Sequence, residues 1–176
     1  MRHAAVLQSA YEMKILLIVL GLLVALILII VVIGAMLPKR HTATRTALIK
    51  ATPERVFALI SGSQEWRTDL KSSESFVEGG RHLRREVYKN GQKLTTELVE
   101  SRPPWFLKGK IVDNPQFGGS WTFRVEQRQE TCSVTITEDG EVYNPVFRFV
   151  SRFIIGHTRT IDNYLVMLSA AAESRK

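Results

Sequence analysis

The sequence predicts an α+β domain in which a curved antiparallel sheet of about seven strands wraps a long C-terminal helix, preceded by a single transmembrane helix. Three observations predict this architecture: an uncharged run near the N-terminus, a middle part of alternating apolar and polar residues divided by turn residues, and an amphipathic final segment. The chain of 176 residues, 45% hydrophobic and 23% charged, is long enough for one domain with its own core plus one additional segment.

The uncharged run covers residues 15–37 and contains two glycines and no proline. A helix of that length would measure about 34 Å, which is enough to cross the roughly 30 Å hydrocarbon core of a bilayer. Pro38 is expected to end the helix, with Lys39 and Arg40 at the level of the lipid headgroups. We therefore expect a short N-terminal tail over residues 1–14, the transmembrane helix over 15–37, a linker over 38–41 and the globular domain over 42–174.

Two other interpretations of the run are a cleaved signal peptide and a buried core helix. A signal peptide has an apolar stretch of about 7 to 15 residues and a small-residue cleavage site, and the segment IGAML fits that pattern poorly. A core helix of a soluble domain carries polar residues along one stripe, and this run has no such stripe.

Basic residues around the run favour a cytoplasmic position for the globular domain, on a single-pass protein of the cell membrane. Positive charge is retained on the cytoplasmic side. Two basic residues precede the run and four follow it closely: Arg2 and Lys14, then Lys39, Arg40, Arg45 and Lys50. The single cysteine, Cys132, agrees with a reducing compartment. The net charge of +7 either helps the domain lie near anionic lipid or simply keeps it soluble.

The middle of the chain predicts one short helix and a series of antiparallel strands. A strand over residues 42–50 leads to a helix that Thr52 caps and Pro53 begins, and GSQEWRTDL is expected to add a broken second helix carrying Trp66. The further strands are expected over 72–78, 81–89, 92–100, 105–113, 120–127 and 131–138, with turns at glycine pairs and at Asn-Gly. In the last two strands every second residue is apolar, which indicates a sheet with one apolar face.

After Asn144-Pro145 the pattern predicts a final helix of about 28 residues. Its apolar stripe contains Val150, Phe153, His157, Ile161, Tyr164, Leu165 and Leu168, with Arg148, Arg152 and Arg159 on the opposite side. Such a helix has to bury its stripe against the apolar face of the sheet.

Two segments carry a resemblance to a known superfamily. IKATPERVFALISGSQEW resembles the opening strand and helix of the START-like, or SRPBCC, superfamily, and FGGSWTFRVEQ with TCSVTITEDGEVYNP is similar to the closing part of its polyketide cyclase/dehydrase-like members. The resemblance covers residues 42–173 and implies the helix-grip fold. It also implies an elongated apolar cavity between sheet and helix, suited to sterol, fatty acyl, polyketide or aromatic ligands. The N-terminal anchor departs from the soluble members, which argues against a freely diffusing carrier.

The residues expected to line that cavity are mostly aromatic, and the alternative is that they simply fill the core. They are Phe57, Trp66, Trp105, Leu107, Trp121, Phe123, Phe153, His157 and Tyr164.

Glu138 and His157 are candidates for a catalytic role: Glu138 shares the parity of the inward-facing residues of its strand, and His157 could donate or accept a proton. Equally, Glu138 can leave the sheet at the Asp139-Gly140 turn and His157 can be a structural histidine.

The sequence offers little for other chemistry. The four histidines are scattered and there is one cysteine, so we expect no metal site and no cofactor. The basic hairpin RHLRREVYKNGQK lacks interleaved stacking residues, so it fits anionic headgroups or bulk water better than nucleic acid.

These observations favour a membrane-anchored, non-catalytic binding module for a lipid or other hydrophobic small molecule. One alternative is a polyketide cyclase/dehydratase-like enzyme that uses His157 or Glu138. The other is an interaction scaffold for a membrane protein partner. Because one fold supports many functions, the site has to distinguish them.

Overall fold

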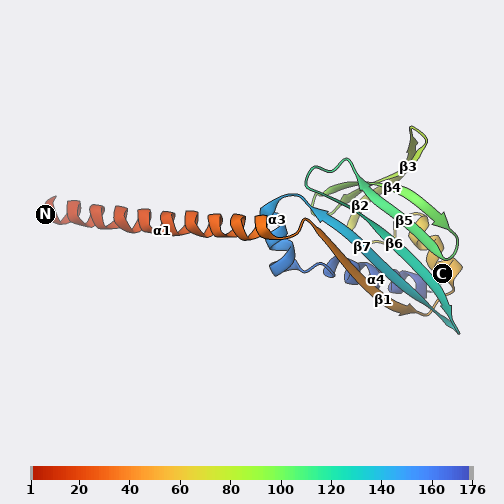
Figure 1. Cartoon of the computed structure of the whole chain (residues 1–176). Coiled ribbons are helices and arrows are strands. Elements are labelled where there is room, and N and C mark those ends of the chain that lie inside the picture. Colours follow the sequence, from red (N-terminus) through yellow and green to blue (C-terminus); the bar gives the residue numbers. More distant parts are fainter. Residues whose placement is uncertain (1, 175–176) are drawn as a thin grey trace.

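The computed structural model describes the chain from residue 2 to residue 174, and its side chains from residue 11. Helix α1 (Arg2–Met36) projects away from a single domain that holds all other elements (Figure 1). The stretch Tyr11–Met36 is long and apolar enough to cross a membrane, and none of its most hydrophobic window is buried in the protein. The interpretation as a buried core helix is therefore wrong.

Helix α1 begins earlier than the sequence predicted. It includes most of the segment expected to be a short tail, because residues 2–14 contain good helix formers such as alanine, leucine and glutamine and no proline or glycine. Met1, which belongs to the same predicted tail, lies outside the described residues.

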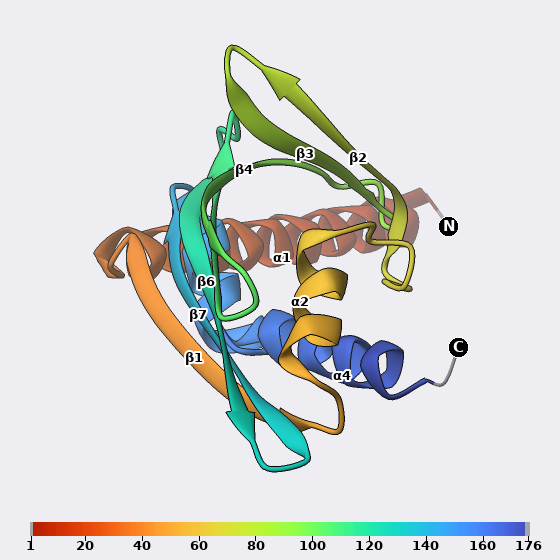
Figure 2. The same cartoon turned by 90° about the vertical axis from the view of Figure 1, so that its right-hand side faces the viewer.

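The domain is built on one seven-stranded antiparallel sheet, as predicted. The strands are β1 (Arg40–Ile49), β2 (Leu70–Glu78), β3 (Arg81–Tyr88), β4 (Lys93–Arg102), β5 (Phe106–Val112), β6 (Phe117–Arg128) and β7 (Thr131–Val142). Their order in the sheet is β1-β7-β6-β5-β4-β3-β2, so that the first strand pairs with the last. The sheet curves strongly, and the β2–β3 hairpin stands well away from β1 (Figure 2).

Strand β1 begins inside the segment expected to be a linker. Arg40 pairs with Glu141 and His41 pairs with Gly140, so the sheet starts within four residues of the end of α1. Backbone pairing satisfies the polar groups of these residues, which a free linker would leave to water.

Helix α2 (Pro53–Ser61) begins where the sequence predicted, with the Thr52 side chain accepting a hydrogen bond from the Arg55 amide. The expected second helix around Trp66 is replaced by turns. The reason lies in the side chains of this segment: the Gln64 amide donates to the carbonyls of Leu59, Ile60 and Gly62, and the Trp66 indole donates to Leu59 at 3.0 Å. These bonds satisfy the carbonyls at the end of α2 and hold the following chain across them.

The expected continuous C-terminal helix is wrong, because the segment is divided. It consists of α3 (Pro145–Val150), the π-helical turn η1 (Ser151–Ile155) and α4 (Arg159–Glu173). Gly156 has a positive φ of 80°, which ends η1 and turns the chain. Only α4 packs on the domain as expected, burying Ile161, Leu165 and Leu168 against the inner face of the sheet and against α2 (Figure 2).

The division changes the surroundings of two predicted residues. Phe153, expected on the buried stripe, is 59% exposed on η1. Arg148, expected on the polar face, is buried and donates to the carbonyls of Ala35 and Leu37 at the end of α1. Helix α3 thus packs mainly against α1, with a smaller contact to β7 of the sheet.

Candidate functional site

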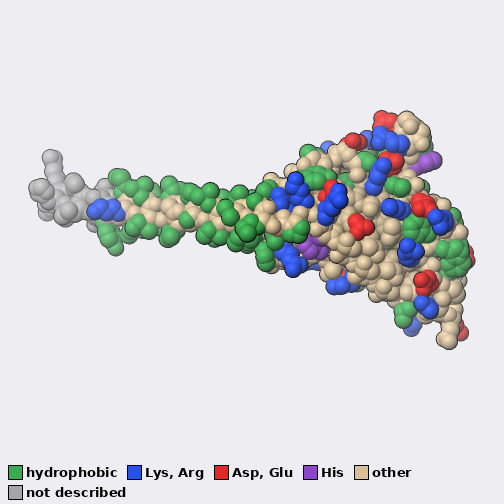
Figure 3. Space-filling model, viewed as in Figure 1, with side chains coloured by type: hydrophobic (Ala, Val, Ile, Leu, Met, Phe, Trp, Pro, Cys, Tyr) green, Lys and Arg blue, Asp and Glu red, His purple; other side chains and the backbone are tan. Residues whose placement is uncertain are grey.

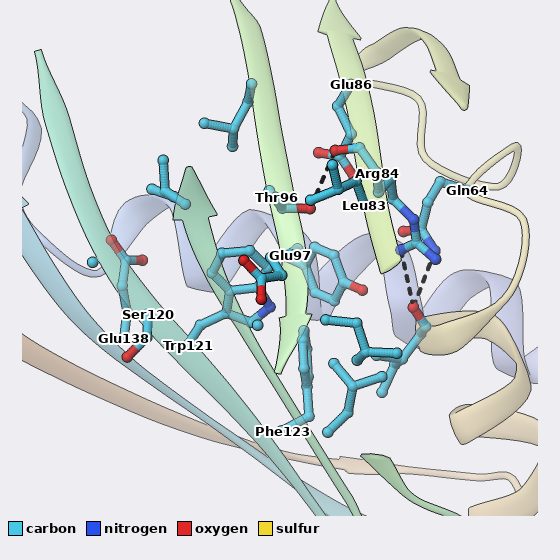
Figure 4. A pocket seen from close by; sticks show the side chains of 18 of the residues that line it. Gln64, Leu83, Arg84, Glu86, Thr96, Glu97, Ser120, Trp121, Phe123 and Glu138 are labelled. Carbon is cyan, nitrogen blue, oxygen red and sulfur yellow. Dashed lines mark hydrogen bonds between the residues drawn. The ribbon is translucent and has the colours of Figure 1, made fainter. Parts of the chain in front are cut away.

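A cavity of about 600 Å³ lies between the curved sheet and helix α4 (Figure 4). Its walls come from β2 to β7, from the first turns of α4, and from the end of α2 and the turns that follow it. Alternate residues of β5, namely Leu107, Gly109 and Ile111, face it. Gly109 has a specific role, because a Cβ atom there would come within 2.6 Å of the Trp121 ring. Its absence lets the indole lie flat against the strand as part of the wall.

Four of the nine residues expected to line a cavity lie on its wall: Leu107, Trp121, Phe123 and Tyr164. Phe57 and Trp66 lie behind the wall in the hydrophobic core, where the Trp66 ring meets the edge of Tyr164 at a centroid distance of 5.3 Å. Trp105 is 49% exposed in the tight turn before β5, and Phe153 is on η1 beyond the Gly156 break. These two and His157 do not line the cavity.

One end of the cavity carries a buried ionic cluster. The Arg67 guanidinium donates to both carboxylate oxygens of Glu86, at 3.1 and 3.0 Å, and to Asp69 at 2.7 Å, while the Tyr88 hydroxyl donates to Glu86 at 3.0 Å. The side chains of Arg67 and Glu86 are only 8% and 7% exposed. Burial and the negative charge of Glu86 raise the pKa of Tyr88 to about 12, so its hydroxyl stays a donor.

Sequence reasoning missed this cluster. Arg67 lies in a turn and Glu86 on β3, and 19 residues separate them. A charged residue in an alternating strand is ordinary, so the pattern contained no signal that these two charges are buried together. Arg67 also lies over the rings of Tyr88 and Tyr164, at 5.5 and 5.3 Å from the centroids, which joins the cluster to the aromatic wall.

A second polar part of the wall is engaged within the protein. The Arg84 guanidinium donates through Nη2 to the carbonyl of Ser61 at 2.7 Å and to that of Gly62 at 3.0 Å, at the C-terminal end of α2. A cation at this end of a helix also complements the helix dipole. Arg84 therefore holds the end of α2 against β3, and the donors of its Nη2 are already used.

Glu138 is a carboxylate of the wall that makes no side-chain hydrogen bond within the described part of the chain. It lies on β7 beside Ser120 and Trp121, at the end of the cavity away from the Arg67 cluster (Figure 4). Within residues 11–174 the basic side chain recorded within 4.0 Å of this carboxylate is His41, whose Nε2 is 4.0 Å away, beyond hydrogen-bonding distance. Burial raises the pKa of the Glu138 carboxyl. A ligand hydroxyl or amine reaching this end of the cavity would find an available partner.

The raised pKa of Glu138 predicts a pH-dependent stability. The folded protein binds the proton of this carboxyl more tightly than the unfolded chain, so the group favours folding below about pH 4.3 and loses that contribution as pH rises through its folded pKa. Glu138→Gln keeps the neutral shape at all pH values. We expect it to raise the melting temperature by a few degrees at pH 7 to 8, and thermal unfolding measured across pH should show this gain shrinking towards pH 4. An equal gain at both ends of the pH range would show that the carboxyl is not responsible.

His157 lies outside the cavity, in the short connection between η1 and α4. Its ring stacks on that of His41 with a centroid distance of 3.9 Å, and its Nδ1 is 3.1 Å from the Ser151 hydroxyl. Burial lowers the pKa of both histidines, and the positive charge of Arg152 lowers the pKa of His157 further. The stacked rings thus connect the chain between η1 and α4 to β1, and their lowered pKa values favour the neutral form.

Within the described part of the chain, no group of three or more His, Cys, Asp or Glu side chains is placed to hold a metal ion. Cys132 is buried in the core, and burial raises the pKa of its thiol. It packs as a small apolar residue.

Comparison with known proteins identifies the family. Residues 40–173 match the family described as polyketide cyclase/dehydrase and lipid transport. The chain belongs to this family. The match covers the whole domain from the start of β1 to the end of α4 and leaves out α1. The comparison with curated proteins found no significant match.

Solved structures of similar fold come from proteins whose names indicate different roles. The di-domain ARO/CYC protein BexL superposes with a TM-score of 0.65 and 13% identity over 83% of this chain, which spans 54% of BexL. Truncated norcoclaurine synthase from Thalictrum flavum has a TM-score of 0.61 and 10% identity over 78% of this chain and 96% of its own. A START superfamily protein from Mycobacterium smegmatis has a TM-score of 0.59 and 14% identity over 76% and 97%. At these identities the likeness shows the shared START-like, helix-grip fold of the polyketide cyclase/dehydrase and lipid transport family.

Proposed function

We propose that this protein is a membrane-anchored binding module that holds a lipid or other hydrophobic small molecule between its sheet and α4. The observation that carries the proposal is a mostly apolar cavity of about 600 Å³ in a domain that only three residues separate from a helix of membrane-spanning length. Pockets of about 300 to 1,000 Å³ suit ligands of drug-like size.

The chemistry of the wall supports an elongated, mostly apolar ligand. Trp121, Phe123 and Tyr164 offer aromatic surface along the middle of the cavity. The donors of Arg67 and of the Arg84 Nη2 are already used within the protein, whereas the Glu138 carboxyl makes no side-chain hydrogen bond among the described residues. Such a wall favours a hydrocarbon or aromatic body with one hydroxyl or amine directed at Glu138, since a buried polar group gains most from a partner.

The position of the cavity supports exchange with a bilayer. Gly118, Gly119 and Gly140 line it at the ends of β6 and β7 that lie beside the start of β1. The Val142 amide donates to the carbonyl of Lys39 at 2.8 Å, which places this end of the sheet directly at the end of α1. With α1 in a membrane, a ligand leaving the lipid meets this end of the domain first. The excess of basic residues after α1 supports a cytoplasmic domain.

The test is to purify the full chain in mild detergent and to identify co-purifying small molecules by native mass spectrometry. Ile111→Trp narrows the cavity, because residue 111 lines it. Crowding of this kind costs about 1 to 3 kcal/mol, so we expect about a 5-fold to 150-fold loss of ligand affinity. Val112→Trp is the matched control, since the side chain of the next residue on β5 faces the opposite side of the sheet.

Equal ligand occupancy in the two tryptophan variants would contradict the proposal. So would the absence of any bound hydrophobic molecule after incubation of the wild-type chain with a lipid extract.

A second candidate function, a cyclase/dehydratase-like enzyme, is favoured by one observation: a carboxyl with a raised pKa lines the cavity. Glu138 in its protonated form could act as a general acid on a bound ligand. The enzyme hypothesis predicts that the small molecule recovered from Glu138→Gln differs in mass from that recovered from the wild-type chain, because only the wild type would convert it. Identical molecules in both would favour the binding module.

A further inference from the structure

The segment α3–η1, residues 145–155, carries an apolar surface that the domain leaves uncovered. Phe153 and Ile154 are 59% and 68% exposed. The exposed large apolar side chains of this region are Tyr143, Val146, Phe147, Phe153, Ile154 and Ile155. Elsewhere on the domain such side chains occur singly, as at Leu48 and Val166, or as an adjacent pair, as at Leu98 and Val99. A group of this size on a soluble surface marks an interaction site.

The structure fixes this surface at the end of α1. Gly34 allows the helix to approach the backbone of Pro145 so closely that a Cβ atom would collide with the Pro145 carbonyl. Arg148 then donates to the carbonyls of Ala35, at 3.3 Å, and Leu37, at 2.8 Å, and so satisfies carbonyls that the end of a helix leaves free. Helix α3 thus packs against the end of α1, and η1 follows directly after it (Figure 1).

Basic side chains lie beside the junction of α1 with the domain, where an anionic membrane surface would attract them. The hydrophobic side chains of α1 lead to a group of Lys and Arg side chains on the domain beside its junction with the helix (Figure 3). Exposed basic residues next to these segments in the sequence are Lys39 and Arg40 after α1, Arg152 on η1 and Arg159 at the start of α4. Apolar side chains flanked by bases are typical of helices that lie in the interface of an anionic bilayer.

We infer that α3–η1 is a second membrane contact, which inserts Phe153, Ile154 and Ile155 into the interface of the same bilayer that α1 crosses. The inference rests on the proposed anchoring through α1. The segment packs against the end of α1, where the membrane-spanning stretch ends. Its exposed apolar side chains are therefore expected to meet lipid and not a soluble partner. Since η1 leads through Gly156 into the part of α4 that lines the cavity, this contact holds that end of the cavity at the lipid surface.

The test places a polarity-sensitive fluorophore on single cysteines introduced into the full chain. Ile154→Cys reports on η1, Leu26→Cys on the middle of α1, and Val166→Cys on an exposed position of α4, 69% exposed, as the matched control. The native Cys132 is buried and should take up no label, which the unsubstituted chain verifies. Each labelled protein is reconstituted into vesicles of phosphatidylcholine and phosphatidylglycerol that contain lipids spin-labelled near the headgroup or deep in the acyl chain.

We expect the label at residue 154 to emit at shorter wavelength than the label at 166 and to be quenched by the headgroup-labelled lipid. The label at 26 should be quenched by the deep lipid. Quenching at 26 with a water-like label at 154 would overturn the second contact and leave the anchor intact. A water-like label at 26 would overturn the anchor and the inference together. A blue-shifted label at 154 that no lipid quenches would also overturn the inference, because a second copy of the chain would then cover the surface.

Discussion

Replacing Arg67 by alanine is expected to lower the free energy of unfolding by about 3 to 5 kcal/mol, because it leaves Glu86 buried without its partner. Among the described residues, Arg67 is the cation that bonds to both oxygens of this carboxylate, and the Tyr88 hydroxyl alone cannot replace it. Denaturant unfolding of the full chain in detergent, followed by tryptophan fluorescence, measures the loss.

Two variants make this prediction specific. Arg128→Ala removes an ion pair with Glu126 that is exposed on both sides, and it should cost less than about 1 kcal/mol. Arg67→Met combined with Glu86→Leu removes both charges and should recover much of the lost stability, since the cost comes from the unpaired charge. If the double variant were as unstable as Arg67→Ala, packing and not charge would explain the effect.

Placing arginines at both Leu22 and Leu26 is expected to release the protein from the membrane. The two residues lie one turn apart near the middle of the stretch Tyr11–Met36. Each arginine at the centre of a span raises the free energy of insertion by about 2.5 to 3.5 kcal/mol. Two arginines together cancel a large part of the free energy that favours the helix in lipid. Carbonate extraction of membranes, followed by immunoblotting of pellet and supernatant, measures the shift.

Leu48→Arg is the control for this experiment, because Leu48 is an exposed leucine of β1 in the domain. It should stay in the membrane pellet. A cleaved signal peptide makes a different prediction: the mature wild-type protein would be shorter by the length of α1 and would already be in the supernatant.

The strands of the sheet were largely predictable, because their signals are local. Alternation in segments such as Trp121, Phe123 and Val125 specifies a strand and its buried face together, and Gly79-Gly80 and Asn90-Gly91 mark turns. The turns expected at Gly118-Gly119 and Asp139-Gly140 are wrong, because these residues pair within β6 and β7. The cap of α2 by Thr52 is equally local. The length of the N-terminal helix was underestimated because hydropathy, and not helix propensity, defined its start.

The C-terminal segment could not be predicted from periodicity alone. Val150 and Ile161 fit one helical stripe, yet the chain turns at Gly156 between them. What divides the segment is the packing of α3 against α1, through Gly34 and Arg148, and no pattern within residues 145–173 reports a contact with a helix over a hundred residues earlier.

The same division decides how much of the site was predictable. The parity of strand residues placed Trp121, Phe123 and Glu138 on the inner face, where the structure has them. Phe153 and His157 were predicted to line the cavity as part of one continuous helical stripe. They lie elsewhere, because the turn at Gly156 interrupts that stripe. The Arg67–Glu86 pair depended on the curvature of the sheet, which no local pattern encodes.

The near absence of a linker has a consequence for an anchored chain. Only three residues separate Met36 from Arg40, and Arg148 ties the end of the helix to the domain, so the two parts are joined without a flexible joint. The uncharged part of α1, residues 15–36, measures about 33 Å as a helix, which slightly exceeds a hydrocarbon thickness of roughly 30 Å. A helix that is too long for its bilayer tilts, and it tilts more as the bilayer thins. The domain has to lean with it, so the thickness of the surrounding lipid sets the angle at which the cavity faces the headgroups.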